Sequence, residues 1–494
     1  MVIEPIMLGR RGVHTVVSRH PGYVTIPGRK RNEHCGVVGF KVRGNSAPYI
    51  YYSLRALQHR GQESAGIAAY DGKIINIRGM GLVHEVFNVD YLKKLSAKVG
   101  IGHVRYSTAG ASTINNAQPI LIHTIVGDVA IAHNGEIANA QELKNNLALQ
   151  GISFTTDSDT EVFLNLIAYN ISRSGDIIEG IKKSMQVAKG SYSIVLLIND
   201  RLFAIRDPLA IRPLILGRVD DGYGVASESV AFDTVGGEII RDVRPGEIVE
   251  ITENGLREHY VMNAEEHTAH CMFEYVYFAR ADSIIDGKNV YDVRIKLGRI
   301  LARESPADAD IVVPVPDSGR THAFGYSLES GIPFAEGLMK NRYVDRTFII
   351  PDQSGRIEEI KLKLNPVKDV VKGKRVVLVD DSIVRGNTMK KIVRLLKSAG
   401  AKEVHVRIGS PPIVAPCYLG IDMKTRKEFI ATGKSVEEIR NIIGADSLAY
   451  ISLDGLVEAI GFPKEDICLA CLTGIYPVEI PGELFIKQKK IDQF

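Results

Sequence analysis

A cysteine near the start of the sequence has neighbours that suit nucleophilic chemistry. Cys35 directly follows the basic, polar stretch 29–34 and begins a strand-like segment that continues to Val42. If the chain were cut before Cys35, the thiol would gain its own α-amine as a general base, because such an amine has a pKa of about 7.7–8.0. The plain structural alternative is a small buried cysteine at a strand start, and Cys35 taken alone favours that alternative.

Four polar segments farther along the chain bear on the role of Cys35. Each is weak by itself, since Asn134–Gly135 is typical of a turn and Ser158–Glu161 is typical of a helix start. The segments are 57–66, 102–108, 133–136 and 158–161.

In this order and spacing, the segments resemble the glutamine amidotransferase domain of the Ntn-hydrolase type, which has an N-terminal cysteine nucleophile. The resemblance implies that Cys35 is the nucleophile and that the residues before it form a propeptide. Arg105 would pair with the α-carboxylate of glutamine and Asp159 with its α-amine. Asn134 and the backbone N–H of Gly135 would form the oxyanion hole, since a tetrahedral oxyanion needs preorganised donors.

A second chemical motif lies at residues 376–388. It consists of a buried strand, the acids Asp380 and Asp381, and a Gly-containing loop that opens into a helix. Such a loop presents N–H groups to an anion, and two carboxylates suit the hydroxyls of a ribose or a Mg²⁺ ion. The alternative is a generic acidic strand end of an α/β fold. The sequence lacks a Walker loop, which argues against an ordinary kinase or ATPase.

The whole 376–388 string resembles the signature of type I phosphoribosyltransferases. The resemblance implies that Asp380 and Asp381 bind the ribose hydroxyls and the metal. The diphosphate-sugar site would also include the residues that cradle the 5′-phosphate, which are Ser382, Arg385, Gly386, Asn387 and Thr388.

Two further segments resemble parts of the same site. Residues 314–320 are similar to the family's pyrophosphate loop, with Ser318 near the Mg²⁺; a simple Pro-Asp-Ser-Gly turn is the alternative. Residues 337–348 look like the flexible loop that closes over the substrate, where positive charge would neutralise departing pyrophosphate. That loop carries Lys340, Arg342 and Arg346, and a solvated charged loop is its plain alternative.

Apart from Cys35, the sequence has four cysteines: Cys271, Cys417, Cys468 and Cys471. Four cysteines suit a [4Fe–4S] cluster or a tetrahedral zinc site, and spacing alone does not choose between them. The spacing is also consistent with a redox Cys-x-x-Cys pair or with four unligated buried thiols. The contexts of the four resemble the iron–sulfur class of the amidophosphoribosyltransferase family, which implies one [4Fe–4S] cluster with a structural role.

The elements that must position these residues change character along the chain. Short strand-like segments punctuated by Gly and Asp dominate up to about residue 262, and strands alternate with helices beyond about residue 290. With the resemblances, this predicts an α+β Ntn-hydrolase glutaminase domain (an αββα sandwich) followed by an α/β type I phosphoribosyltransferase domain. The predicted divisions are a propeptide or leader at 1–34, the glutaminase domain at 35–265, the phosphoribosyltransferase domain at 285–460 and a C-terminal tail with cluster ligands at 461–494.

Composition excludes several classes of protein. Of the 494 residues, 45% are hydrophobic and the net charge is only +3, which argues against disorder and against broad nucleic-acid binding. No apolar run approaches the roughly 18 residues of a membrane helix. Five cysteines are odd in number and sparse, which favours a reducing cytoplasm. Residues 1–34 hold six Lys/Arg and two acids, which fits either an organelle presequence or a basic tail.

The resemblance to the amidophosphoribosyltransferase family covers about residues 35–480. It implies the first committed step of de novo purine synthesis: glutamine, phosphoribosyl diphosphate and Mg²⁺ would yield 5-phosphoribosylamine, glutamate and pyrophosphate. It also implies feedback by purine nucleotides and a homotetramer. Glucosamine-6-phosphate synthase and asparagine synthetase share such glutaminase domains, but the phosphoribosyl string argues against both. An alternative function of a different class is that of a non-catalytic regulator that responds to purines.

Overall fold

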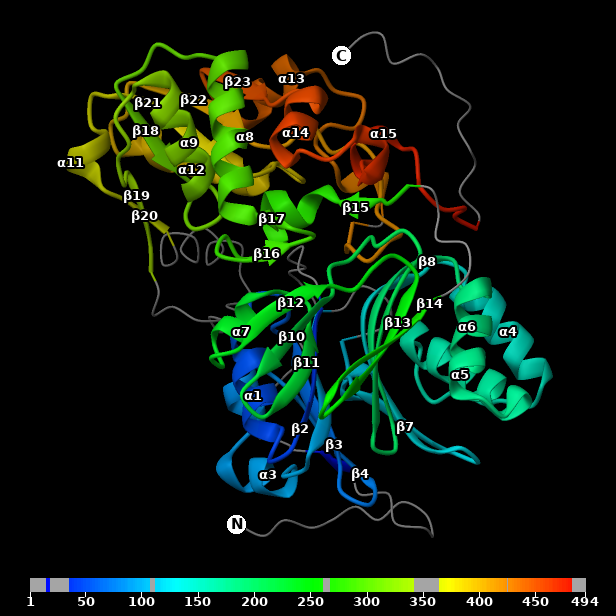
Figure 1. Cartoon of the computed structure of the whole chain (residues 1–494). Coiled ribbons are helices and arrows are strands. Elements are labelled where there is room, and N and C mark those ends of the chain that lie inside the picture. Colours follow the sequence, from blue (N-terminus) through cyan, green and yellow to red (C-terminus); the bar gives the residue numbers. More distant parts are fainter. Residues whose placement is uncertain are drawn as a thin grey trace.

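The computed structural model describes residues 15–17, 35–106, 112–260, 267–341, 364–423 and 425–481. Its N-terminal half contains two face-to-face sheets (Figure 1). The first has the order β1-β4-β3-β5-β2-β11-β10-β12, with the bounds Thr15–Val17, Ile74–Met80, Ser64–Tyr70, Val99–Arg105, Gly36–Val42, Gly222–Ala226, Ile215–Val219 and Glu238–Asp242. The second has the order β14-β13-β9-β8-β7-β6, with the bounds Gly255–Tyr260, Glu247–Thr252, Arg201–Arg206, Gly190–Ile198, Gly127–Ile137 and Ile120–Thr124.

Helices cover the outer faces of this pair of sheets. Inward-facing residues such as Val37, Ile101, Ala132 and Val195 form a dry layer between the sheets, as alternation along paired strands requires. Helix α1 (Ala47–Ala56) packs on the first sheet, and α4 (Ala140–Leu149), α5 (Asp159–Ser174) and α6 (Ile177–Val187) lie on the second (Figure 1). The predicted αββα sandwich is therefore confirmed. Shorter helices are α2 (Val83–Val86), α3 (Val89–Lys94), α7 (Val230–Asp233) and the 3₁₀ turn Ile114–Asn116.

The C-terminal half is built on a parallel sheet, as the alternation of strands and helices predicted. The strand order is β18-β21-β22-β23, with the bounds Ile311–Pro314, Arg375–Asp380, Glu403–Ile408 and Ser447–Tyr450. The longer helices of this half are α8 (Val290–Glu304), α9 (Arg320–Ser330), α12 (Asn387–Ser398), α13 (Val436–Ile443) and α14 (Leu453–Ile460). Smaller elements are β19 (Leu338–Lys340), β20 (Leu364–Pro366), α11 (Lys368–Val371) and two 3₁₀ turns, Arg426–Glu428 and Lys464–Asp466.

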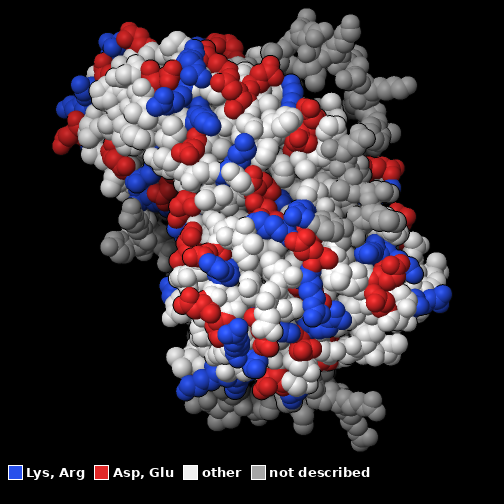
Figure 2. Space-filling view, in the orientation of Figure 1, with Lys and Arg blue, Asp and Glu red and all other residues white. Residues whose placement is uncertain are grey.

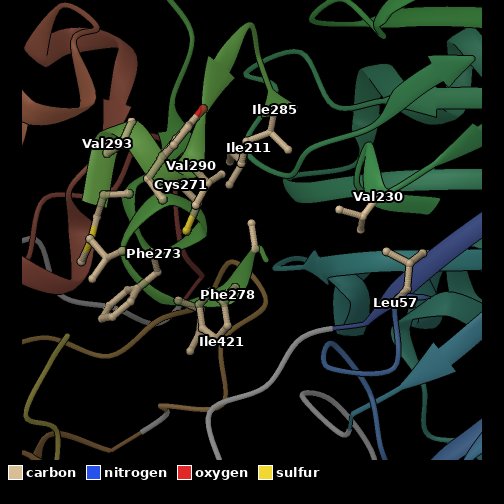
Figure 3. Packing of buried hydrophobic residues seen from close by; sticks show 14 of the residues in the cluster. Leu57, Ile211, Val230, Cys271, Phe273, Phe278, Ile285, Val290, Val293 and Ile421 are labelled. Carbon is tan, nitrogen blue, oxygen red and sulfur yellow. The ribbon is translucent and has the colours of Figure 1, made fainter. Parts of the chain in front are cut away.

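A compact junction joins the two halves. Strand β15 (His270–Cys271) pairs in parallel with β24 (Ile467–Cys468), so part of the expected C-terminal tail is packed into the body of the protein. The rest of the junction comprises the π-helix Glu274–Phe278, β16 (Ile284–Ile285), β17 (Lys288–Asn289) and α15 (Ala470–Thr473). Figure 3 shows Cys271 among apolar side chains from both halves, including Ile211, Val290 and Val293. The two halves thus share one hydrophobic core at the junction.

Local sequence signals fix where the key helices begin. The Ser158 side chain accepts a hydrogen bond from the backbone N–H of Thr160 at the start of α5. Ser435 and Glu438 form a capping box at the start of α13. Gly386 precedes α12 with φ +75°, and a Cβ there would come within 2.2 Å of Ile430. The tight turn before α12 therefore requires glycine.

The surface matches the balanced composition. On the face that Figure 2 shows, Lys and Arg are interspersed with Asp and Glu over both halves. In the part of the chain that the structure describes, none of the helices combines the length and apolarity needed to cross a bilayer.

Candidate active sites

Cys35 lies at the edge of the first sheet, directly before β2. Antiparallel pairing sets Gly36 opposite Val104, and therefore places Cys35 beside Arg105 at the end of β5. The thiol is 7% exposed and donates to the Tyr106 carbonyl at 3.5 Å, while the Nε of Arg60 donates to the Cys35 carbonyl at 3.0 Å. Burial raises the pKa of the thiol; the Tyr106 carbonyl and then the charge of Arg105 oppose that rise. The thiol is thus placed beside a cation but needs a base to ionise.

The expected oxyanion donors lie together on β7. Asn134 is 1% exposed, and neither polar atom of its side chain has a hydrogen-bond partner. A buried amide without partners is costly, so its presence suits a ligand that supplies the missing bonds. Gly135 has φ +151°, and a Cβ there would lie 2.0 Å from the Ser191 carbonyl oxygen. Only glycine fits at this position.

Asp159 is held rigidly at the first turn of α5. Its Oδ2 accepts the backbone N–H of Ile137, and its Oδ1 accepts that of Thr160, both at 2.9 Å. The charges of Arg105 and Asp159 both act on the Cys35 thiol, which places the three side chains in one neighbourhood. The structure therefore brings together one thiol, one cation and one carboxylate, the set that the sequence predicted for binding an amino acid.

The second site lies at the carboxyl end of β21, as expected for an open parallel sheet. Asp380 and Asp381 are 9% and 5% exposed, and the Ser318 hydroxyl donates to Asp380 Oδ1 at 3.4 Å. Burial, followed by the charge of Asp381, raises the pKa of Asp380 well above its usual value. Two adjacent buried acids with a hydroxyl beside them are an oxygen donor set that fits Mg²⁺, which commonly takes one or two carboxylates plus substrate phosphates.

The predicted phosphate loop follows directly after Asp381 in the sequence. The Ser382 hydroxyl donates to Asp381 Oδ2 at 2.6 Å, and Arg385 forms an ion pair with Glu428. Gly386 turns the chain so that Asn387 and Thr388 open α12, whose free N–H groups favour an anion.

The segment 337–348, which is expected to close over the substrate, is described only as far as residue 341. Lys340 on β19 forms an ion pair with Asp317 at 2.8 Å, in the loop that holds Ser318; the Pro316–Asp317 peptide bond is cis. Arg342 and Arg346 lie outside the described residues.

The other four cysteines converge at the junction. Cys271 faces Cys468 in the β15–β24 pair, and the Cys471 carbonyl accepts the backbone N–H groups of Val414 and Ala415, which lie just before Cys417. Burial raises the pKa of the Cys471 thiol well above its usual value, and the charges of the other three cysteines add to it. We call these four residues the cysteine tetrad.

The tetrad has the donor chemistry of a ligand set for a metal or an iron–sulfur group. All four thiols are free and buried, and N–H donors point at sulfur: Leu419 N–H to Cys417 at 3.4 Å and Arg212 Nη1 to Cys271 at 3.4 Å. Among the described residues, no three His, Cys, Asp or Glu side chains are close enough to hold a single metal ion.

Sequence reasoning missed a set of buried charges around the first site. Arg60 and Arg212 are almost completely buried, as are Glu228 and Glu274. Arg60 bonds to Glu274 at 2.7 and 3.0 Å and to Glu228 at 2.5 Å. The polar segment 57–66 contains Arg60, but nothing in the sequence names its partners, which lie 168 and 214 residues away.

Known proteins match this chain over nearly its whole length. A family described as "Glutamine amidotransferase domain" matches residues 103–234, and one described as "Phosphoribosyl transferase domain" matches residues 281–408. Amidophosphoribosyltransferase of Archaeoglobus fulgidus is 55% identical, over 91% of this chain and 99% of that protein; the Bacillus subtilis enzyme is 48% identical, over 91% and 95%.

A solved structure is also similar. It is glutamine phosphoribosylpyrophosphate amidotransferase from B. subtilis, described as complexed with ADP and GMP, with a TM-score of 0.85, 46% identity, and coverage of 91% of this chain and 98% of that one. A second, with the same TM-score and identity, is described as the allosteric regulatory enzyme of purine biosynthesis and covers 91% of this chain and 97% of that one. On these matches and on the two sites described above, the chain belongs to the amidophosphoribosyltransferase family, enzymes of the first step of purine biosynthesis.

Proposed function

We propose that this chain divides its family's reaction, the glutamine-dependent amidation of phosphoribosyl diphosphate, between the two sites. The nucleophile site around Cys35 releases ammonia from glutamine. The site at the carboxyl end of β21 uses that ammonia to displace pyrophosphate. The single observation that carries the division is the gathering of Cys35, Arg105 and Asp159 in one half and of Ser318, Asp380 and Asp381 in the other.

In the first half-reaction, Cys35 acts once residues 1–34 have been removed. Its new α-amine takes the thiol proton, and the thiolate attacks the carboxamide carbon of glutamine. Arg105 and Asp159 hold the α-carboxylate and α-amine of the substrate. Asn134 and the Gly135 N–H stabilise the oxyanion. Ammonia leaves, a thioester forms on Cys35, and water releases glutamate.

In the second half-reaction, Asp380 and Asp381 bind the ribose hydroxyls. With Ser318 they would also hold Mg²⁺, which would neutralise charge on the leaving pyrophosphate. The loop Ser382, Arg385, Gly386, Asn387 and Thr388 cradles the 5′-phosphate at the start of α12. Lys340 would contribute positive charge toward the leaving pyrophosphate, and the same role is proposed for Arg342, which lies outside the described residues. Ammonia travels inside the protein and attacks C1 of the ribose, which gives 5-phosphoribosylamine.

The cysteine tetrad would hold one [4Fe–4S] cluster. Its role is structural, because neither half-reaction transfers electrons. Cys271 belongs to the junction, Cys417 to the C-terminal half, and Cys468 and Cys471 to the returning C-terminal segment. One group bound by all four would tie these three segments together.

Three further features of the family are proposed for this chain. Purine nucleotides inhibit it, in line with the ADP and GMP named in the B. subtilis complex. It assembles as a homotetramer. It works in the cytoplasm, where a reducing environment keeps the Cys35 thiol free.

Glutamate release from glutamine tests the proposal. It is measured anaerobically, with and without phosphoribosyl diphosphate and Mg²⁺. Release that rises sharply with the diphosphate supports two coupled sites. Equal release under both conditions indicates a glutaminase that serves another acceptor, as glucosamine-6-phosphate synthase does. No release in either condition, from protein whose mass shows that it begins at Cys35, contradicts the assignment of Cys35.

A further inference from the structure

A continuous chain of buried hydrogen bonds connects the nucleophile with the cysteine tetrad. Its centre is Glu274, on the π-helix that begins three residues after Cys271. The Glu274 carboxylate accepts from Arg60 Nη2 at 2.7 Å and from Nη1 at 3.0 Å. It also accepts from Arg212 Nη1 at 3.4 Å. One carboxylate thus joins two guanidinium groups from different parts of the N-terminal half.

Each guanidinium also bonds to a group that matters for function. Arg60 Nε donates to the Cys35 carbonyl at 3.0 Å, so it fixes the backbone of the nucleophile itself. Arg212 Nη1 donates to Cys271 Sγ at 3.4 Å, and its Nε and Nη2 donate to the Leu419 carbonyl at 3.2 and 2.5 Å. Leu419 is two residues from Cys417. Arg212 therefore contacts both the segment that carries Cys271 and the segment that carries Cys417.

The four buried charges along this chain of bonds neutralise one another only when all four are in place. Arg60, Arg212 and Glu274 are at most 2% exposed, and the fourth charge, Glu228, is fully buried beside Arg60. A buried charge that loses its partner is strongly unfavourable. If Arg212 moves, Glu274 must therefore move with it, and Arg60 must follow Glu274. The tetrad lies at one end of this line, and the Cys35 backbone lies at the other.

We propose that Glu274 is a positioning residue that couples the state of the cysteine tetrad to the placement of Cys35. With Arg212 held by the tetrad, Glu274 holds Arg60, and Arg60 holds the Cys35 carbonyl in the orientation for attack. This inference rests on the proposed role of Cys35 as the nucleophile. Glu274 does not touch glutamine, so it acts on the rate of thiol attack and leaves substrate binding by Arg105 and Asp159 unchanged.

The Glu274→Gln variant tests this proposal, because glutamine keeps the shape of the side chain and removes its charge. Glu247→Gln is the matched control. Glu247 is another fully buried carboxylate bonded to a guanidinium, but its partner is Arg241, at 2.7 and 2.8 Å, and it is not a member of the line of bonds between Cys35 and the tetrad. The full-length enzyme is prepared anaerobically. Iron per chain is measured, and rates are normalised to chains that begin at Cys35 by mass.

Three readouts separate positioning from general packing. In Glu274→Gln, the kcat with glutamine and the rate at which a glutamine-analogue electrophile alkylates Cys35 fall by about tenfold or more. The KM for glutamine and the ammonia-dependent rate stay within about twofold of wild type. Glu247→Gln keeps all of these values near wild type. If Cys35 is alkylated as fast in Glu274→Gln as in Glu247→Gln, the proposal is overturned, even where wild-type glutaminase activity upholds the assignment of Cys35.

A second variant tests the link to the tetrad and decides the matter if Glu274→Gln does not fold. Arg212→Lys keeps the charge but cannot bond to Leu419, Cys271 and Glu274 together. Arg212→Lys slows alkylation of Cys35 as Glu274→Gln does. In the double variant Glu274→Gln with Arg212→Lys, alkylation is no slower than in either single variant, because the effects of substitutions in one line of contacts are not additive. The coupling is contradicted if Cys35 is alkylated at the wild-type rate in Arg212→Lys, or if the two losses in alkylation rate are fully additive in the double variant.

Discussion

Gly420 of the C-terminal half lies directly against Gly135, the residue expected to supply an oxyanion N–H. A Cβ on Gly420 would come within 3.1 Å of the Gly135 backbone, and Gly420 has φ +99°, so a side chain there would be crowded and its backbone strained. The neighbouring Leu419 carbonyl accepts from the Ser191 hydroxyl at 2.8 Å. The loop that carries Cys417 therefore packs against the proposed oxyanion residue.

The buried amide of Asn134 predicts a defect confined to the transition state. In Asn134→Ala, the kcat for glutamine should fall by about 10²–10³-fold with little change in KM, because the lost donor bonds to an oxyanion that forms only during reaction. Steady-state kinetics with glutamine and then with ammonia measure this. A rise in KM at constant kcat would place Asn134 in substrate binding.

The two acids at the end of β21 predict a defect at the other site. In the double variant Asp380→Asn with Asp381→Asn, formation of 5-phosphoribosylamine should stop from both glutamine and ammonia. Alkylation of Cys35 by a glutamine-analogue electrophile should persist, since the acids lie in the other half. Product assays and mass spectrometry are the measurements. Continued synthesis would show that the ribose and metal bind elsewhere.

The tetrad predicts the metal content of the protein. Protein purified without oxygen should be brown, with about four irons per chain. Cys417→Ser should lose the colour, whereas Cys35→Ala, which leaves the tetrad intact, should keep it. Metal analysis and the visible spectrum provide the readout. Stoichiometric zinc with no iron would rule out the cluster.

A buried histidine predicts part of the acid sensitivity of the fold. His322 is fully buried, and burial, with the nearby charge of Arg294, lowers the pKa of its ring to about 3. Since the ring has a pKa near 6.5 when unfolded, its contribution is fully present above pH 6.5 and is lost as pH falls toward 3. Between pH 6.5 and pH 5 the loss is about 2 kcal/mol.

His322→Gln should therefore show a smaller drop in melting temperature between pH 7 and pH 5 than wild type. The exposed His84 offers a control, because His84→Gln should leave the wild-type pH dependence unchanged. Parallel pH dependence in wild type and His322→Gln would mean that His322 is charged in the folded protein.

Local patterns predicted the elements that carry the chemistry. The strand, acids and helix-opening loop predicted within residues 376–388 form the end of β21, Asp381 and the turn into α12. These signals reside in one short stretch of the sequence. The assignments of roles to Cys35, Arg105, Asn134 and Asp159 came from resemblance, and the structure places these residues in one half.

Long-range partners were beyond reach of the sequence. The bonds from Arg60 to Glu274 join residues 214 positions apart, and nothing in either local sequence specifies the other. Likewise, residues 461–494 are predicted as a C-terminal tail with cluster ligands, but no local pattern specifies that Cys468 pairs with Cys271 in β24 and β15. Strand β1, which lies within residues 1–34 and pairs with β4, was also not predicted. Such contacts are fixed by tertiary packing, which single-segment patterns do not encode.

The division of labour between two sites is tested most directly by Cys35→Ala. The variant is assayed for 5-phosphoribosylamine with glutamine and, separately, with ammonia at a pH where free ammonia is abundant. Complete loss with glutamine and a near wild-type rate with ammonia is the predicted result. Loss of both activities in a folded variant that retains its iron, or retention of glutamine use, would contradict the account.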